Sequence, residues 1–111
     1  MNKLLNHSAN GKTIICTNCN KIFLEFNNLF IKFTESEFQS FADYVGKIDG
    51  KYWQSKNARS VFSRKIIISV NCKNINVLLT MEELTELKTL LFPRINNNRM
   101  YFTDSYRVSL N

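Results

Sequence analysis

Apolar and polar residues alternate along residues 22–33, on both sides of an Asn-Asn pair at positions 27 and 28. A period of two is typical of a strand with one buried face, and Asn tolerates the positive φ of a tight turn better than any residue except Gly. The pattern predicts a β-hairpin in which residue 26 pairs with 29, 24 with 31 and 22 with 33. A capping box at Thr34 and Glu37, followed by apolar residues three and four apart, then predicts a helix that Asp49-Gly50 ends.

The same pattern returns in residues 66–91. Strand-like residues on both sides of a four-residue loop, 71–74, predict a second hairpin with residue 66 opposite 79, 68 opposite 77 and 70 opposite 75. A second capping box at Thr80 and Glu83 precedes a stripe of leucines, and Pro93 ends this helix. The chain therefore reads as two β-hairpin–helix units (ββαββα) over about 13–49 and 65–93. A connection at 50–64 joins them, and an extension at 94–111 follows.

These elements predict the fold class and the domain organisation. Two hairpins side by side form a four-stranded antiparallel sheet, and both helices cover its apolar face, which is a two-layer α+β architecture with an internal repeat. Residues 13–16 are expected to add a short strand before the first hairpin, and residues 100–103 or 106–110 to add an edge strand. A chain of 111 residues has room for one such domain.

The predicted pairing leaves large apolar side chains on the outer face of the sheet. These are Phe23, Phe30, Ile67 and Leu78. A monomer that left such a patch in contact with water would be unusual. Three alternatives could cover the patch. The chain itself could do so, through Tyr101 and Phe102 or the loop around Trp53; so could a second copy in a homodimer, or a different partner.

Two cysteines bracket a predicted turn between strands, in the sequence Cys16-Thr17-Asn18-Cys19. This spacing lets both thiolates reach one metal ion, as in a zinc knuckle, and thiolate sulfur suits Zn²⁺. The pair is half of a tetrahedral site. The other thiol and the imidazole of the chain belong to Cys72 and His7, so the missing ligands come from these or from another subunit. A redox dithiol and a pair of reduced thiols without a role are the alternatives.

A longer run carries a resemblance. From His7 to Phe38 the chain has a His and a Gly before C-x-x-C, then a Phe-Asn-Asn hairpin, then a helix that begins T-x-x-E-F. Over residues 1 to about 90 it resembles an uncharacterised family of small bacterial proteins, a domain of unknown function. The resemblance implies metal binding by His7, Cys16 and Cys19, and no particular activity. Asn20 and Asn27 stand where the family has Gly; both take positive φ readily, so the expected fold is unchanged.

The charge balance indicates the chemistry of a partner. Lysine and arginine outnumber aspartate and glutamate by 15 to 9, which gives a net charge of +6, a pI of about 9.4 and a preference for acidic partners. Cations and aromatic rings interleave in the connection, at Lys51, Tyr52, Trp53, Lys56, Arg59, Arg64 and Lys65. Phosphate contact and base stacking need this combination, so the connection is a candidate site for single-stranded nucleic acid. The alternative is a solvated loop whose rings pack back onto the core.

The residue inventory limits the chemistry. With one His and three Gly there is no glycine-rich phosphate loop and no catalytic constellation, and the glutamates cluster at helix starts, where negative charge is stabilising. No apolar run reaches the roughly 20 residues of a membrane span and the start has no signal peptide, so a cytoplasmic protein is expected. The sequence thus predicts a small non-enzymatic interaction domain with Zn²⁺ as its candidate cofactor. Single-stranded nucleic-acid binding is the alternative function.

Overall fold

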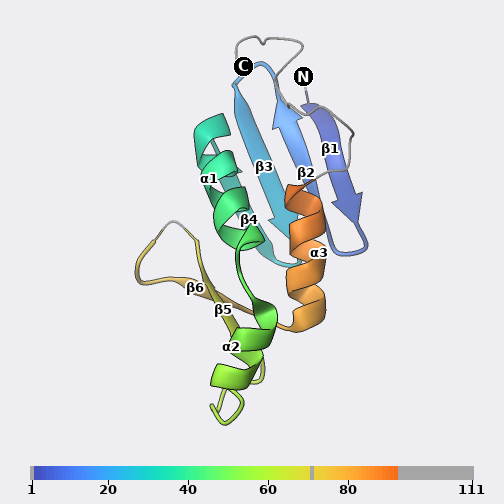
Figure 1. Ribbon diagram of the computed structural model, residues 1–111. Helices are drawn as coiled ribbons and strands as arrows, with labels where there is room; N and C mark the ends of the chain where they lie inside the picture. The colour runs from blue at the N-terminus through green and yellow to red at the C-terminus, as the bar shows by residue number, and fades with distance from the viewer. Residues whose placement is uncertain (1, 71, 93–111) are drawn as a thin grey trace.

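The computed structural model describes residues 2–70 and 72–92 (Figure 1). Its first half is a four-stranded antiparallel sheet in the order β1-β2-β3-β4, so each strand pairs with the next in sequence. The strands are β1 Asn2–Ser8, β2 Gly11–Cys16, β3 Lys21–Phe26 and β4 Leu29–Phe33. The predicted register of the first hairpin is confirmed, with residue 26 opposite 29, 24 opposite 31 and 22 opposite 33. Asn27 takes a positive φ of 55° in the turn.

Strand β2 confirms the expected strand at 13–16, but β1 has no counterpart among the sequence predictions. Its register shifts between Leu4 and Asn6, where a bulge interrupts the ladder. A bulge reverses the inside–outside order of the residues after it, so the alternation that marks a strand is lost. Contacts with the last helix hold β1 in place instead: the Glu86 carboxylate accepts three hydrogen bonds from the end of β1 and the turn that follows.

Two helices lie across one face of this sheet, α1 Glu35–Gly46 and α3 Met81–Leu91 (Figure 1). Both begin at the predicted capping boxes, in which the Thr side chain and the Glu side chain each accept a backbone N–H, at Thr34 with Glu37 and at Thr80 with Glu83. The apolar stripes are buried, namely Phe38, Phe41, Ala42 and Val45 in α1 and Leu84, Leu87, Leu90 and Leu91 in α3. The predicted α+β class is therefore confirmed.

The first helix is shorter than expected, and another helix follows it. α1 ends at Gly46, and Asp49 is the N-cap of α2, Gly50–Lys56, where its side chain accepts the N–H groups of Lys51 and Tyr52. The first part of the expected 50–64 connection is therefore helical. Asp is favourable both in a turn and at the N-cap of a helix. The Asp-Gly pair alone therefore does not show whether a loop or a new helix follows.

The second hairpin, β5 Ile66–Ser69 and β6 Asn76–Leu79, forms a sheet of its own. Its predicted register is confirmed at the pairs 66–79 and 68–77, but the ladder ends at Ser69 and Asn76 and does not include the pair 70–75.

The expected single sheet made of both hairpins is wrong. β1 and β2 extend the first hairpin on the β3 side, and the segment containing α2 leads the second hairpin away, so that β5 packs against α2 and β6 against α3. The two β-hairpin–helix units are thus alike in local sequence but not in their places in the fold.

One hydrophobic core joins the two sheets. It takes inward side chains from β2 to β6 and from α1 and α3. Near its centre the Phe33 ring lies 5.6 Å from Phe38 and 5.3 Å from Phe41, measured between ring centroids. Both sheets are therefore parts of one packed unit.

Some predictions fall outside the described residues. These are the edge strands at 100–103 and 106–110 and the cover by Tyr101 and Phe102. Among the helices that the structure describes, none is both long and apolar enough to span a membrane.

Candidate functional site

The face of the four-stranded sheet opposite the helices is open in the part of the chain that the structure describes. Strand register places two rings on it, Phe23 of β3 and Phe30 of β4, stacked at 5.8 Å between centroids with 25° between their planes. Ile14 lies opposite Phe23 and Leu4 opposite Ile14, so the apolar strip crosses all four strands. Phe30 is 62% exposed and Leu4 58% exposed, which is high for such large apolar side chains.

Lysines border this strip. The outward positions carry Lys12 of β2, Lys21 of β3 and Lys32 of β4, which lie opposite Glu25, Cys16 and Phe23 in the ladders. Glu25 is the one outward carboxylate on the described strands, and its contact with the Lys12 ammonium is a loose ion pair at 3.8 Å. The open face is therefore apolar along its middle and positive along its borders.

The interface predicted from four apolar residues is divided between the two sheets. Phe23 and Phe30 lie together as expected, whereas Ile67 and Leu78 pair with each other on β5 and β6. The structure therefore brings together two of the four residues on the open face. Ile14 of β2 and Leu4 of β1 complete the strip; Leu4 was missed because β1 was not recognised as a strand, and Ile14 because the pairing of β2 with β3 was not predicted.

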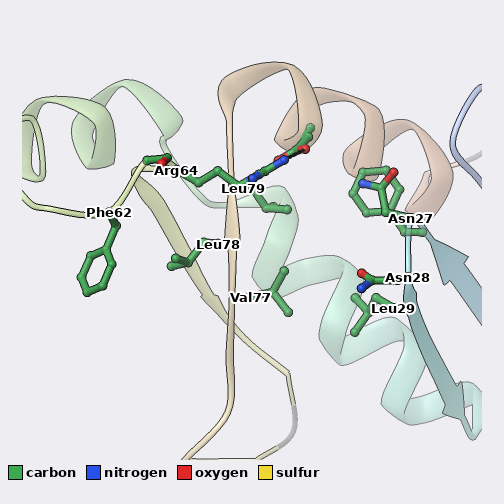
Figure 2. Close-up of a pocket in the computed structure, with 11 residues that line it drawn as sticks. Asn27, Asn28, Leu29, Phe62, Arg64, Val77, Leu78 and Leu79 are labelled. Atoms are coloured by element: carbon green, nitrogen blue, oxygen red, sulfur yellow. Dashed lines mark hydrogen bonds and ion pairs between the residues drawn. The ribbon is translucent and has the colours of Figure 1, made fainter.

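A groove of about 570 Å³ lies where the two sheets meet. Figure 2 shows Asn27, Asn28 and Leu29 at the end of the first hairpin on one side, with Val77, Leu78 and Leu79 of β6 and the loop at Phe62 across from them.

The two charged side chains of the groove bind each other. Arg64 donates from Nε and Nη2 to the Glu83 carboxylate at 2.8 and 2.9 Å, and the Thr80 N–H donates to the same group. The Arg64 guanidinium holds the pKa of Glu83 below its ordinary value. A bidentate pair of this kind leaves neither group free for general acid–base work.

Most of the predicted nucleic-acid residues in the 51–65 segment make contacts inside the chain. The Lys56 ammonium lies 5.0 Å from the centre of the Trp53 ring and 5.8 Å from that of Tyr52, and Trp53 is half-buried against the core. Lys65 Nζ donates to three oxygens of the loop before it.

Together with the Arg64–Glu83 pair, these contacts occupy three of the five cations in the segment. Lys51 and Arg59 remain exposed. Trp53 thus packs back as the alternative expects, whereas Tyr52 is 55% exposed, and the segment does not present one continuous basic surface.

The cysteine turn connects β2 to β3. Cys16 Sγ accepts hydrogen bonds from the Cys19 side chain and from the backbone N–H groups of Cys19 and Asn18, which lower the pKa of Cys16. The hydrogen bond to Cys16 and burial raise the pKa of Cys19, while the Lys21 N–H donates to Cys19 Sγ and acts in the opposite direction. Asn20 follows with a φ of 55°, the conformation expected after the second cysteine. The turn therefore brings the two cysteines together, and the Cys19 thiol also donates to the Cys16 carbonyl oxygen at 3.9 Å.

The other two candidate ligands lie elsewhere. His7 is opposite Lys12 at one end of the β1–β2 ladder, whereas Cys16 is opposite Asn2 at the other end. Cys72 is exposed in the loop between β5 and β6. Within residues 2–70 and 72–92, no three His, Cys, Asp or Glu side chains group together in a way that holds a metal ion. One described chain therefore brings together two of the four predicted ligands.

Comparison with known protein families agrees with the resemblance found in the sequence. A family of unknown function (DUF6686) matches residues 1–111. Neither the curated proteins nor the solved structures contain a match. On the strength of a match over its whole length, the chain belongs to this family of unknown function, DUF6686.

Proposed function

We propose that the chain is a small non-enzymatic interaction domain that binds an acidic partner on the open face of its four-stranded sheet. The observation that carries this proposal is the stacked and exposed Phe23–Phe30 pair, bordered by lysines. An apolar strip supplies burial on binding, and the positive border selects for negative charge. The excess of basic residues in the whole chain acts in the same direction.

The described acidic groups near the hairpin turns support a binding role over catalysis. Glu83 is bound by Arg64 and Thr80, and Glu86 by Ser8 and Asn10. Each carboxylate thereby joins a helix to a neighbouring segment. A general acid or base needs access to substrate and a pKa near the working pH, whereas the hydrogen bonds to both groups lower their pKa values.

Single-stranded nucleic acid is the acidic partner that the face fits best. Nucleobases stack on exposed aromatic rings while lysines contact the phosphates, and each base–ring contact contributes about 1–3 kcal/mol. Phe23 and Phe30 offer two rings on neighbouring strands, with Lys32 opposite Phe23 and Lys12 two strands from Phe30. The sheet face suits this role better than residues 51–65, where Arg64 and Lys65 already have intramolecular partners.

Fluorescence anisotropy with a labelled oligothymidylate tests this proposal at low salt. Phe30→Ala is expected to weaken binding by about tenfold or more, because it removes one stacking ring. Phe62→Ala is the matched control, since Phe62 is another exposed ring, at 51% against 62% for Phe30, and lies in a loop outside the four-stranded sheet. Lys32→Gln is expected to reduce the slope of log affinity against log salt by about 1, and Lys47→Gln, beyond α1, to leave it unchanged.

A poly-glutamate peptide provides the comparison with an acidic protein. Binding of the peptide but not of the oligonucleotide would exclude nucleic acid as the partner. It would still support the proposal that the chain is an interaction domain for acidic partners. If neither probe binds, or if Phe30→Ala and Phe62→Ala behave alike, the open face is not the binding surface.

A further inference from the structure

The cysteine turn brings two thiols together at the end of the sheet. Cys16 is the last residue of β2, and the Cys19 thiol lies 3.9 Å from the Cys16 carbonyl oxygen, so the turn folds the second cysteine back over the first. Asn20 follows in the left-handed conformation, at φ 55°, and leads the chain into β3. Two cysteines three residues apart in a tight turn of this kind can place both thiolates on one metal ion.

A single chain does not complete a zinc site around this pair. Structural zinc takes four Cys or His ligands in a tetrahedron. The sequence holds three Cys and one His, and residues 1, 71 and 93–111 contain neither type. His7 lies at the far end of the β1–β2 ladder, and Cys72 belongs to the loop of the other sheet. The remaining two ligands must therefore come from outside the chain.

We propose that two copies of the chain bind one Zn²⁺ between their Cys16–Cys19 turns, so that each copy supplies two of four thiolates. Residues 17–20 are exposed at the end of the sheet, and Cys19 itself is exposed, so a second turn can approach. Four thiolates around Zn²⁺ leave a net charge of −2. The ammonium group of Lys21, which is opposite Cys16 on the same face of the sheet, offsets one charge in each copy.

The binding step needs no co-reactant. Each thiol loses its proton to solvent as its sulfur–zinc bond forms, so formation of the site releases protons and weakens at low pH. Sulfur keeps its oxidation state throughout. The proposal does not depend on the stacked rings of the open face, because Phe23 and Phe30 do not take part in it; Lys21 is the residue that the two proposals share.

The test uses the full chain, reduced and freed of metal, and then titrated with Zn²⁺ alone. Native mass spectrometry is expected to show conversion of a monomer to a dimer that carries one zinc for two chains. Titration with Co²⁺ is expected to give the visible absorption of a tetrahedral thiolate site. Cys16→Ser and Cys19→Ser should each lower the zinc affinity by about 100-fold or more and keep the chain monomeric.

Three matched variants distinguish loss of the zinc site from misfolding and from effects on the open face. His7→Ala and Cys72→Ser alter the other two candidate ligands and are expected to dimerise with zinc like the natural chain. Phe30→Ala should also dimerise, whatever its effect on nucleic-acid binding. Circular dichroism of the metal-free proteins should show the same fold for all variants, because the turn cysteines are not part of the core.

Several outcomes would overturn the proposal. One zinc bound per monomer, or loss of binding in His7→Ala or Cys72→Ser, would place the site within a single chain. Absence of zinc binding at concentrations that saturate structural zinc sites would leave the pair as free thiols. Zinc-dependent dimers that persist in both Cys16→Ser and Cys19→Ser would locate the metal elsewhere.

Discussion

Replacement of Gly11 by Ala tests how closely the sheet and α3 approach each other. Gly11 begins β2 and lies opposite Phe26. A Cβ atom added there would overlap the Glu25 carbonyl oxygen and would come within 2.9 Å of Leu90 Cδ1 and 3.1 Å of Phe26 Cα. Two of these three neighbours are backbone atoms of β3, which a side-chain rotation does not move. The substitution therefore requires β2 to separate from β3.

The size of the effect follows from these contacts. An added group in a packed site costs about 1–3 kcal/mol, and an overlap with backbone belongs at the upper end, at about 3 kcal/mol. At roughly 4 °C per kcal/mol for a domain of this size, the melting temperature should fall by about 12 °C. The same substitution at Gly46 is the matched control. Its Cβ would lie 3.0 Å from Cζ of the Phe92 ring, which is 46% exposed and free to shift.

The two variants are expected to differ in sign. Gly46 is the last residue of α1, where Ala favours the helix over Gly by up to about 1 kcal/mol, so Gly46→Ala should be neutral or stabilising. Urea and thermal unfolding, followed by circular dichroism, measure both. The packing argument would be incorrect if Gly11→Ala unfolded at the same urea concentration and temperature as the natural chain. It would also be incorrect if Gly46→Ala lost as much stability as Gly11→Ala.

Three further predictions concern the contact between α3 and β1, the N-cap of α3 and the turn at Asn27. Hydrogen bonds from Ser8 and Asn10 lower the pKa of Glu86 from its ordinary value of 4.5, so its stabilising effect is present above that pH and is lost as the pH falls through the folded-state value. Glu86→Gln should therefore unfold more easily at neutral pH, and urea titrations at several pH values should show the difference from the natural chain shrinking on acidification. Thr80→Ala removes the α3 cap and should cost about 1 kcal/mol in urea unfolding, an effect that Thr80→Ser should restore in large part. Asn27→Ala should cost about 1–2 kcal/mol because Ala resists the φ of 55°, whereas Asn27→Gly should melt at or above the natural temperature.

Local signals in the sequence determined the elements correctly wherever a few adjacent residues contain the whole cause. The Asn27-Asn28 turn, both capping boxes and the apolar stripes of α1 and α3 are confirmed because each rests on interactions within a turn or two of the chain. The adjacency of Phe23 and Phe30, the positive φ at Asn20 and the placement of the cysteines in one turn followed for the same reason. The main parts of the candidate sites were thus readable from pattern.

Contacts between distant segments decided the rest. Alternation shows which face of a hairpin is buried, but it does not say which neighbour its edge strand will pair with. Strand β1, with its bulge, is held by Glu86 of α3, 78 residues from Ser8, and β2, which pairs with β1, takes the edge of β3 that the second hairpin was expected to fill. The Arg64–Glu83 pair and the separation of His7 from Cys16 have the same origin. Long-range pairings depend on which surfaces meet once the helices pack, and packing, unlike a cap or a turn, is a property of the whole chain.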